Sequence, residues 1–338
     1  MENNLQSNKA VLPIFIITII IIFLVYTPII FPALFSSLVG NYSDGINTPF
    51  EFGHQAGVLV ASNILILGFG FAYYKKKLPN QLQNIIERIR TFEISKKNTL
   101  IIFIIIMGIY IGFSIPELFL DESLVWDDYI VLESALELWP DGESDNVYVQ
   151  EQNDRYVRMF LLDASLNVFQ NIKFLPFIAS ILVVSFTYLI TTQICHKRFA
   201  GIISMIVLLQ SGIFLKYDTI AVYENFWVLF YLISLYVIKK GWFLSPVFYI
   251  LAVFSKAYMA PFFVMTLFTT YRSKIKTRTK LAILFSYVVI IIAAIGIIFA
   301  GETLYPQVFE IDTPRFLLGF AATAFQFRFD LFLSLIHI

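Results

Sequence analysis

The sequence is short of charge and of cysteine, and each shortage excludes a class of protein. Only 14% of the 338 residues are Asp, Glu, Lys or Arg, whereas 58% are hydrophobic. A soluble globular domain has about a quarter of its residues charged, so the composition excludes an ordinary soluble domain. Cys195 is the only cysteine, which excludes an intrachain disulfide. No cluster of Cys and His has metal-ligand spacing, since His54, His196 and His337 lie in separate regions.

The sequence also lacks the motifs of nucleotide binding. Neither a G-x-G-x-x-G pattern nor a P-loop occurs, so no loop is predicted to hold the phosphates of a nucleotide. The formal net charge is zero, and no nucleic-acid partner is predicted. If the protein handles an activated group, we expect its donor to arrive through the membrane.

What the sequence does contain is a series of apolar runs of about 20 residues, long enough to cross a bilayer as helices. They predict an all-α, polytopic integral membrane helical bundle with about nine or ten transmembrane helices. The predicted spans are 11–35, 55–74, 99–119, 173–194, 201–215, 219–238, two short spans in 242–271 that break around 254–256, 281–300, and a last apolar segment from 316. Helical spacing also predicts an amphipathic helix over 78–92 and a helix over 155–171.

Charges are sorted along the chain, and the sorting predicts a topology. Basic clusters at 75–77, 196–198, 239–240 and 272–280 mark cytoplasmic turns, because cytoplasmic loops concentrate Lys and Arg. We therefore expect a multi-pass protein of the plasma (cell) membrane with a cytoplasmic N-terminus. Because the sequence stops at Ile338 within an apolar run, we expect the reading frame to be incomplete at its C-terminus.

The segment from Glu117 to Arg158 differs from its apolar flanks. It holds half of the acidic residues, and no Lys or Arg occurs between Asn98 and Arg155. Such a loop is expected on the outer face, with short helices in it. Its first acids are Asp121, Glu122, Asp127 and Asp128, and the alternation of spans brings Asp218, Glu224 and Lys256 to the same face.

The order of these features resembles the GT-C membrane glycosyltransferases, especially the protein O-mannosyltransferase and lipid A aminoarabinose transferase branch. WDDYIVLESALELWPDG matches the acidic pair after a span with Asp127 and Asp128, although the family has Glu second. Glu224 matches a later acid, but Asp218 and Thr219 stand where the family has an Arg. SPVFYILAVFSKAYMAPFFVM matches the family Lys with Lys256. The resemblance covers roughly residues 99 to 280.

The resemblance implies transfer of a sugar from a polyprenyl-phosphate donor to a protein, lipid or glycan acceptor at the outer face. A carboxylate acts as general base, and cations balance the charge of the leaving phosphate. The candidate residues are Asp127 or Asp128 for the base, Lys256, Arg155 and Arg158 for the donor phosphate, Glu224 and Asp218 for a second acidic site, and Asp121 with Glu122 as an alternative pair. Clustered carboxylates are also compatible with a divalent metal, Mg or Mn.

These expectations divide the chain into three parts. Residues 1–98 contain two spans and a basic cytoplasmic connector, 99–280 form the GT-C-like core with the acidic loop 117–158, and 281–338 add further spans. Two other functions fit the composition. One is a transporter or flippase for a lipid-linked or anionic solute, and the other is a non-catalytic membrane subunit in which the acidic loop is a docking surface.

Overall fold

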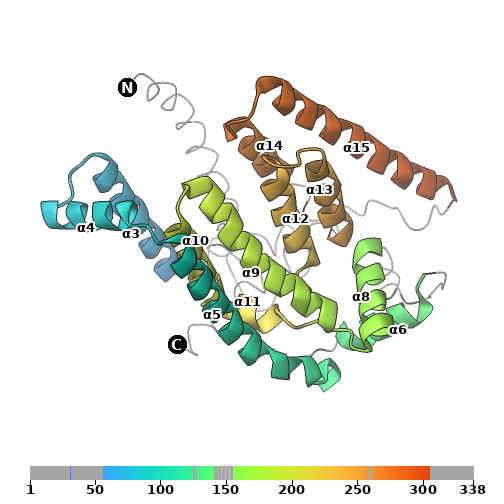
Figure 1. The fold of residues 1–338 in the computed structure, drawn as a ribbon. Helices are drawn as coiled ribbons and strands as arrows, with labels where there is room; N and C mark the ends of the chain where they lie inside the picture. The colour runs from blue at the N-terminus through green and yellow to red at the C-terminus, as the bar shows by residue number, and fades with distance from the viewer. Residues whose placement is uncertain are drawn as a thin grey trace. The chain divides into compact units, whose positions relative to one another are not determined.

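The computed structural model describes residues 31, 56–124, 126, 128–140, 146, 149, 152, 155–256, 259 and 262–304. Within these residues it contains twelve α-helices, two 3-10 helices and no β-strand, which confirms the all-α prediction (Figure 1). The chain divides into two compact units, one of residues 1–91 with 311–338 and one of residues 92–310. The predicted span 11–35 and the last apolar segment from 316 lie outside the described residues.

The first unit contributes two described helices. Helix α3 (Ala56–Tyr74) matches the predicted span 55–74, and α4 (Asn80–Thr91) matches the predicted amphipathic helix. Leu82, Ile85 and Ile89 lie on α4 at helical spacing and are all exposed. The apolar stripe of α4 is therefore not used to pack against the described residues around it.

Among the described residues, two helices are long and apolar enough to cross a membrane, and both belong to the second unit. One is the 24-residue segment Lys96–Phe119, in which α5 (Lys96–Ser114) continues into η2 (Ile115–Phe119). The other is the 22-residue α9 (Phe174–Cys195). The remaining helices of this unit are η3 (Glu122–Leu124), α6 (Asp128–Leu138), α8 (Tyr156–Phe169), α10 (Arg198–Leu209), α11 (Gly212–Tyr217), α12 (Phe226–Val237), α13 (Leu244–Ser255), α14 (Phe263–Arg272) and α15 (Thr277–Leu304).

Two predicted boundaries differ from the structure. The predicted span 201–215 is broken into α10 and α11 at Gln210 and Ser211, where the Ser211 hydroxyl accepts a hydrogen bond from the Phe214 N–H and caps α11. The predicted span 219–238 was wrong at its start, since the helix begins only at Phe226. The reason is that backbone groups at Ala221 and Val222 bind distant side chains instead of forming a helical ladder.

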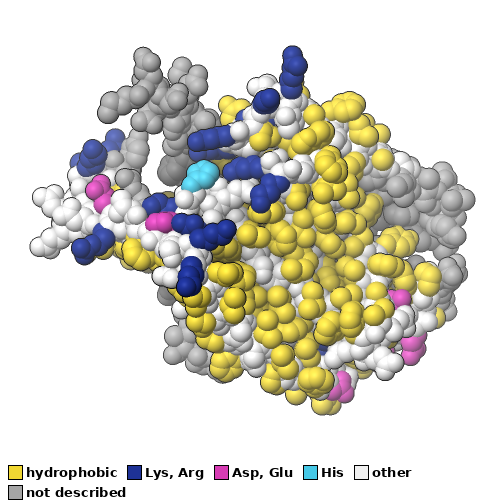
Figure 2. Space-filling model, viewed as in Figure 1, with side chains coloured by type: hydrophobic (Ala, Val, Ile, Leu, Met, Phe, Trp, Pro, Cys, Tyr) yellow, Lys and Arg dark blue, Asp and Glu magenta, His cyan; other side chains and the backbone are white. Residues whose placement is uncertain are grey.

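The core of the second unit forms around α9. This helix packs against α10 and α12, α12 packs against α13, and α13 packs against α15 (Figure 1). Val184 on α9, Met205 on α10 and Met159 on α8 are all fully buried in the resulting cluster. Apolar side chains on the opposite sides of these helices remain exposed, as for Ile104, Ile109 and Phe113 on α5. Figure 2 shows apolar side chains gathered over much of the face that it presents.

Gly201 allows α10 to approach α9 closely. A Cβ atom at this position would lie only 2.6 Å from Cδ2 of Tyr188 and would also overlap the hydroxyl of Thr192, both on α9. Around Gly108 on α5, by contrast, a Cβ atom would meet nothing within 4 Å. The same substitution therefore has opposite steric consequences on the two helices.

We predict that Gly201→Ala destabilises the protein by about 1–3 kcal/mol, the range for overpacking a close contact. The matched change Gly108→Ala should leave stability unchanged or raise it by about 0.5–1 kcal/mol, because Ala is the better helix former. Thermal unfolding of the full chain in detergent measures both. Equal unfolding temperatures for the two variants would contradict the close approach of α9 and α10.

Candidate active site

The residues between α11 and α12, Asp218 to Asn225, form a non-helical segment that we call the central loop. Its residues Ile220, Ala221 and Val222 are apolar and buried. Side chains from the acidic loop and from α8 bind its backbone from two sides. The central loop is therefore the point at which the acidic loop meets the later helices.

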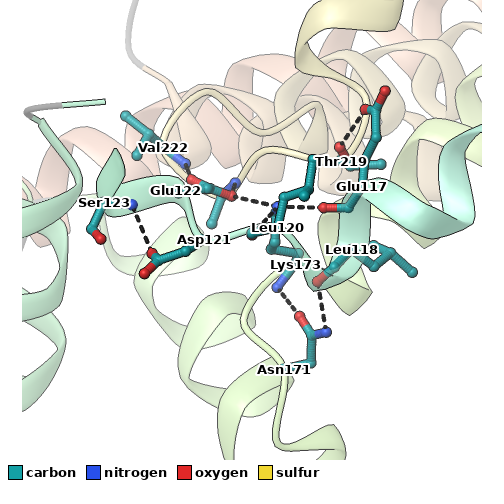
Figure 3. Close-up of polar contacts among 11 residues, drawn as sticks. Glu117, Leu118, Leu120, Asp121, Glu122, Ser123, Asn171, Lys173, Thr219 and Val222 are labelled. Atoms are coloured by element: carbon teal, nitrogen blue, oxygen red, sulfur yellow. Dashed lines mark hydrogen bonds and ion pairs between the residues drawn. The ribbon is translucent and has the colours of Figure 1, made fainter. Parts of the chain in front are cut away.

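Glu122 binds the central loop through its backbone N–H groups. The carboxylate accepts hydrogen bonds from Ala221 N at 2.7 Å and from Val222 N at 3.3 Å, and it lies 3.9 Å from Nζ of Lys173 (Figure 3). Its side chain is buried. Burial raises the pKa of Glu122, and the hydrogen bond from Ala221 and the charge of Lys173 act against this rise. Such a carboxylate acts as a structural acceptor, because both of its oxygens are used within the protein.

Lys173, at the start of α9, holds the beginning of the acidic loop. Its Nζ donates to the carbonyl oxygens of Glu117 at 2.6 Å and Leu120 at 2.9 Å, while the Asn171 side chain donates to Leu118 O at 3.1 Å (Figure 3). Burial lowers the pKa of Lys173, and the charge of Glu122 opposes that shift. Sequence reasoning missed this residue. Its signal was that Lys173 is the single cation between Arg158 and His196.

Arg158 binds the central loop through its carbonyl groups. The guanidinium donates from Nε to the Glu224 carboxylate at 2.9 Å, from its second terminal nitrogen to Val222 O at 2.9 Å and Ala221 O at 3.3 Å, and from the first to Gln152. Only 1% of Arg158 is exposed. A guanidinium has five N–H donors, and most of them are used here inside the protein.

Glu224 interacts with two of the predicted phosphate-binding cations, Arg158 and Lys256. Its second carboxylate oxygen is buried and has no hydrogen-bond partner among the described residues. Lys256, in the break between α13 and α14, interacts electrostatically with Glu224, Arg155 and Arg158. Burial lowers the pKa of Lys256, the charge of Glu224 raises it, and the two arginines lower it. Lys256 Nζ also lies 5.5 Å from the centroid of the Trp227 ring.

Asp128 is an exposed acid of the site. It begins α6 and accepts a hydrogen bond from the Tyr223 hydroxyl at 2.6 Å, which links the acidic loop to the central loop a second time. The rings of Trp126, Tyr217 and Tyr223 pack together at centroid distances of 5.7, 5.1 and 5.3 Å and support that link. Asp127, the other half of the predicted pair, lies outside the described residues.

The alternative pair divides into two different environments. Glu122 is buried against the central loop, as described above, whereas Asp121 is exposed. The Asp121 carboxylate accepts a hydrogen bond from the Ser123 N–H at 2.9 Å, and the hydrogen bonds from Ser123 lower its pKa. Of the two acids, only Asp121 is open to solvent.

Asp218 lies at the start of the central loop and faces α5. It accepts a hydrogen bond from the Ser114 hydroxyl at 2.8 Å, and only 1% of the residue is exposed. Burial raises the pKa of Asp218 to about 6, although the Ser114 hydrogen bond acts in the opposite direction. The adjacent Thr219 donates to the Glu117 carboxylate at 3.2 Å.

An apolar cavity of about 400 Å³ lies beside the N-terminal half of α8. It is lined by Trp139, Tyr156, Val157, Phe160, Leu161, Phe230 and Leu251. Four of these residues, Tyr156, Val157, Phe160 and Leu161, belong to the first half of α8, the helix that also carries Arg158. Its lining suits a hydrocarbon chain rather than a polar group.

We predict that Arg158→Met lowers the free energy of unfolding by about 3–5 kcal/mol, because it leaves the buried charge of Glu224 without its partner. Arg155→Met, three residues earlier and outside α8, is the matched control and should cost much less. A double-mutant cycle of Arg158→Met with Glu224→Gln should show positive coupling in thermal or denaturant unfolding. Additive losses would mean that the two residues do not support each other.

A second prediction concerns pH. The folded pKa of Asp218 is raised to about 6, so its protonated form stabilises the fold at low pH, and this contribution is lost as pH rises through about 6. The unfolding temperature of Asp218→Asn relative to wild type should therefore increase from about pH 4 to about pH 7. Asp121→Asn should show the opposite trend on acidification, since the pKa of Asp121 is lowered. A difference between wild type and Asp218→Asn that does not change with pH would refute the raised pKa.

Among the described residues, no three His, Cys, Asp or Glu side chains gather in a way that could hold a metal ion. The compatibility with Mg or Mn noted from the sequence therefore stays untested, and no residue is assigned to a metal. Comparison of the chain with protein-family models, with curated proteins and with solved structures found no match. What the site does has to be inferred from its own side chains.

Proposed function

We propose that the chain is a membrane glycosyltransferase that resembles the GT-C class and uses a polyprenyl-phosphate-linked sugar as donor. In this proposal it is a multi-pass protein of the plasma membrane, with a cytoplasmic N-terminus and with the acidic loop on the outer face. The acceptor is a hydroxyl of a protein, lipid or glycan at that face.

The observation that carries the proposal is the convergence of acids and cations from distant parts of the sequence on the central loop. Asp128 reaches it through Tyr223, Glu122 through Ala221 and Val222, and Arg158 through Glu224. Lys256 joins the same group from the far end of α13. An exposed carboxylate beside a group of cations is what transfer to a hydroxyl with an anionic leaving group requires.

The proposed step exchanges one C–O bond for another at the anomeric carbon and moves one proton. The acceptor oxygen attacks the anomeric carbon of the sugar while its proton passes to Asp128 or Asp127. The bond between that carbon and the phosphate oxygen breaks, and the electron pair leaves with the polyprenyl phosphate. Asp128 suits the role of base because it is exposed and held in place by the Tyr223 hydroxyl. Attack from the face opposite the phosphate gives inversion.

The cations divide into two roles in this proposal. Lys256 and Arg155 balance the charge of the donor phosphate. Arg158, whose donors are directed to Glu224, Gln152 and the central loop, is instead a positioning residue. The same holds for Glu122. The apolar cavity at Tyr156 and Phe160 is assigned in this proposal to isoprene units of the donor, because its lining is apolar.

The burial of three acids excludes them from any acidic docking surface. Glu122, Asp218 and Glu224 are at most 4% exposed and bind groups within the same chain. A docking partner would not reach them. Their burial is instead suited to fixing the loop that carries Tyr223 beside Asp128.

The test is transfer of labelled sugar from polyprenyl-phosphate donors by membranes that contain the full chain. We predict that Asp128→Asn or Asp127→Asn lowers the rate about 10²- to 10⁴-fold, the usual contribution of a general base. The matched control is Glu137→Gln on α6, an exposed acid of the same loop, which should keep full activity. Insertion and yield of each variant are compared by detergent extraction and size exclusion.

The assay also has outcomes that remove the proposal. Full transfer by both Asp127→Asn and Asp128→Asn would exclude a catalytic role for the pair. Absence of transfer by the wild-type chain across polyprenyl-phosphate hexose and pentose donors would exclude the donor class.

A further inference from the structure

A second cavity, of about 660 Å³, lies in the second unit where the beginnings of α5 and α10 meet the ends of α9 and α12. Four cations line it, Lys96, Lys197, Arg198 and Lys240, against the single carboxylate of Glu93. None of these residues belongs to the proposed active site. Figure 2 shows Lys and Arg side chains gathered along one border of the apolar surface, with Asp or Glu side chains both among them and at the opposite border. We call this cavity the basic pocket.

Several of its cations are held in fixed positions. Arg198 Nε donates to Glu93 Oε1 at 2.9 Å and to Ile94 O at 3.0 Å. Lys240 Nζ donates to the Tyr236 hydroxyl at 2.6 Å and lies 4.8 Å from the centroid of that ring. The four cations come from three separate segments of the chain, so the fold itself brings them together. A preformed group of cations of this kind is suited to a phosphate anion.

The beginning of α10 adds to the positive potential of the pocket. This 12-residue helix starts at Arg198 without a side-chain N-cap, and the carboxylate of Glu93 accepts a hydrogen bond from the Arg198 N–H at 3.1 Å. One anionic group of the protein is thus already bound at this helix end. The helix dipole favours a further negative charge beside it.

The walls of the pocket continue into apolar surface. Tyr188 and Leu189 of α9 line it, and Ile194 of α9, 64% exposed, follows at the end of the same helix. Ile203 and Val207 on α10 are also exposed. A small soluble anion would gain nothing from this surface, whereas an anionic lipid would place its headgroup among the cations and its acyl chains along the helices.

We propose that the basic pocket binds the phosphate-bearing headgroup of an anionic phospholipid. The cations around Tyr236 bind the phosphate, and the exposed sides of α9 and α10 contact the acyl chains. Basic pockets between transmembrane helices at the cytoplasmic surface are the usual sites of this recognition. The bound lipid joins α5, α9, α10 and α12 at their basic ends, and it does so independently of any glycosyl transfer.

The test uses the purified full chain in detergent, titrated with phosphatidylglycerol or with phosphatidylcholine, with bound lipid counted by native mass spectrometry. We predict that the chain prefers the anionic lipid and that Lys96→Gln/Lys240→Gln weakens this binding at least about tenfold. Lys97→Gln/Lys239→Gln is the matched control. It removes the same charge from the adjacent positions, which do not line the pocket, and it should bind as wild type does.

Further measurements identify the ligand and show whether a loss of binding is due to misfolding. Displacement of the lipid by glycerol phosphate would support headgroup recognition, whereas tight binding of glycerol phosphate without binding of phosphatidylglycerol would overturn the lipid proposal. Lys96→Arg/Lys240→Arg should retain binding because it keeps both charges. In the wild-type chain alone, binding should weaken as salt rises from about 0.05 to about 0.5 M. Equal loss in both Gln double variants, or no preference for the anionic lipid, would refute the site.

Discussion

The structure of the second unit depends on how the central loop is held. Arg158 donates hydrogen bonds to the backbone carbonyl groups of Ala221 and Val222, and Glu122 accepts hydrogen bonds from the N–H groups of the same two residues. Buried backbone groups need hydrogen-bond partners. At Ala221 and Val222 these two side chains supply the partners that the backbone supplies within a helix. The loop is thereby kept out of α12. Tyr223 and Glu224 follow directly, and their side chains are presented to Asp128 and to Arg158.

Burying so many charged groups has a cost that hydrogen bonds only partly offset. Removing an ion pair from water often costs as much as the pair regains, so such groups are weak evidence for stability. Here Glu224 and Asp218 each keep one buried oxygen without a hydrogen-bond partner among the described residues. A core built for stability alone would contain apolar side chains at these positions. The arrangement is instead consistent with a loop whose conformation matters more than its contribution to folding.

The helices were predictable from sequence where a long apolar run was bounded by charge. This holds for α5 with η2, for α9, and for the break between α13 and α14, where Lys256 interrupts an apolar block. The central loop was not predictable, because Ile220, Ala221 and Val222 have the composition of a span. The side chains that bind the backbone of these residues are far away in the sequence, about a hundred residues for Glu122 and more than sixty for Arg158. No local pattern reports contacts at that separation.

The burial of individual site residues was also not predictable from the sequence, even for residues that are neighbours in the chain. Charge pattern predicted which segments hold the functional acids, but Asp121 and Glu122 are adjacent and end in opposite environments. Arg155 and Arg158 are also close in the chain, and only Arg158 is fully buried. Which member of each pair turns inward is decided by the central loop and by Lys173, so composition alone could not separate them.

The separation of these partners also bears on biosynthesis. Glu122 lies 99 residues before Ala221, and Arg158 lies 66 residues before Glu224. In a chain made from its N-terminus, both side chains leave the ribosome long before the backbone that they bind. Until then the carboxylate and the guanidinium have to remain hydrated. Assembly of this region is accordingly a late event, which has to wait until the central loop has been made.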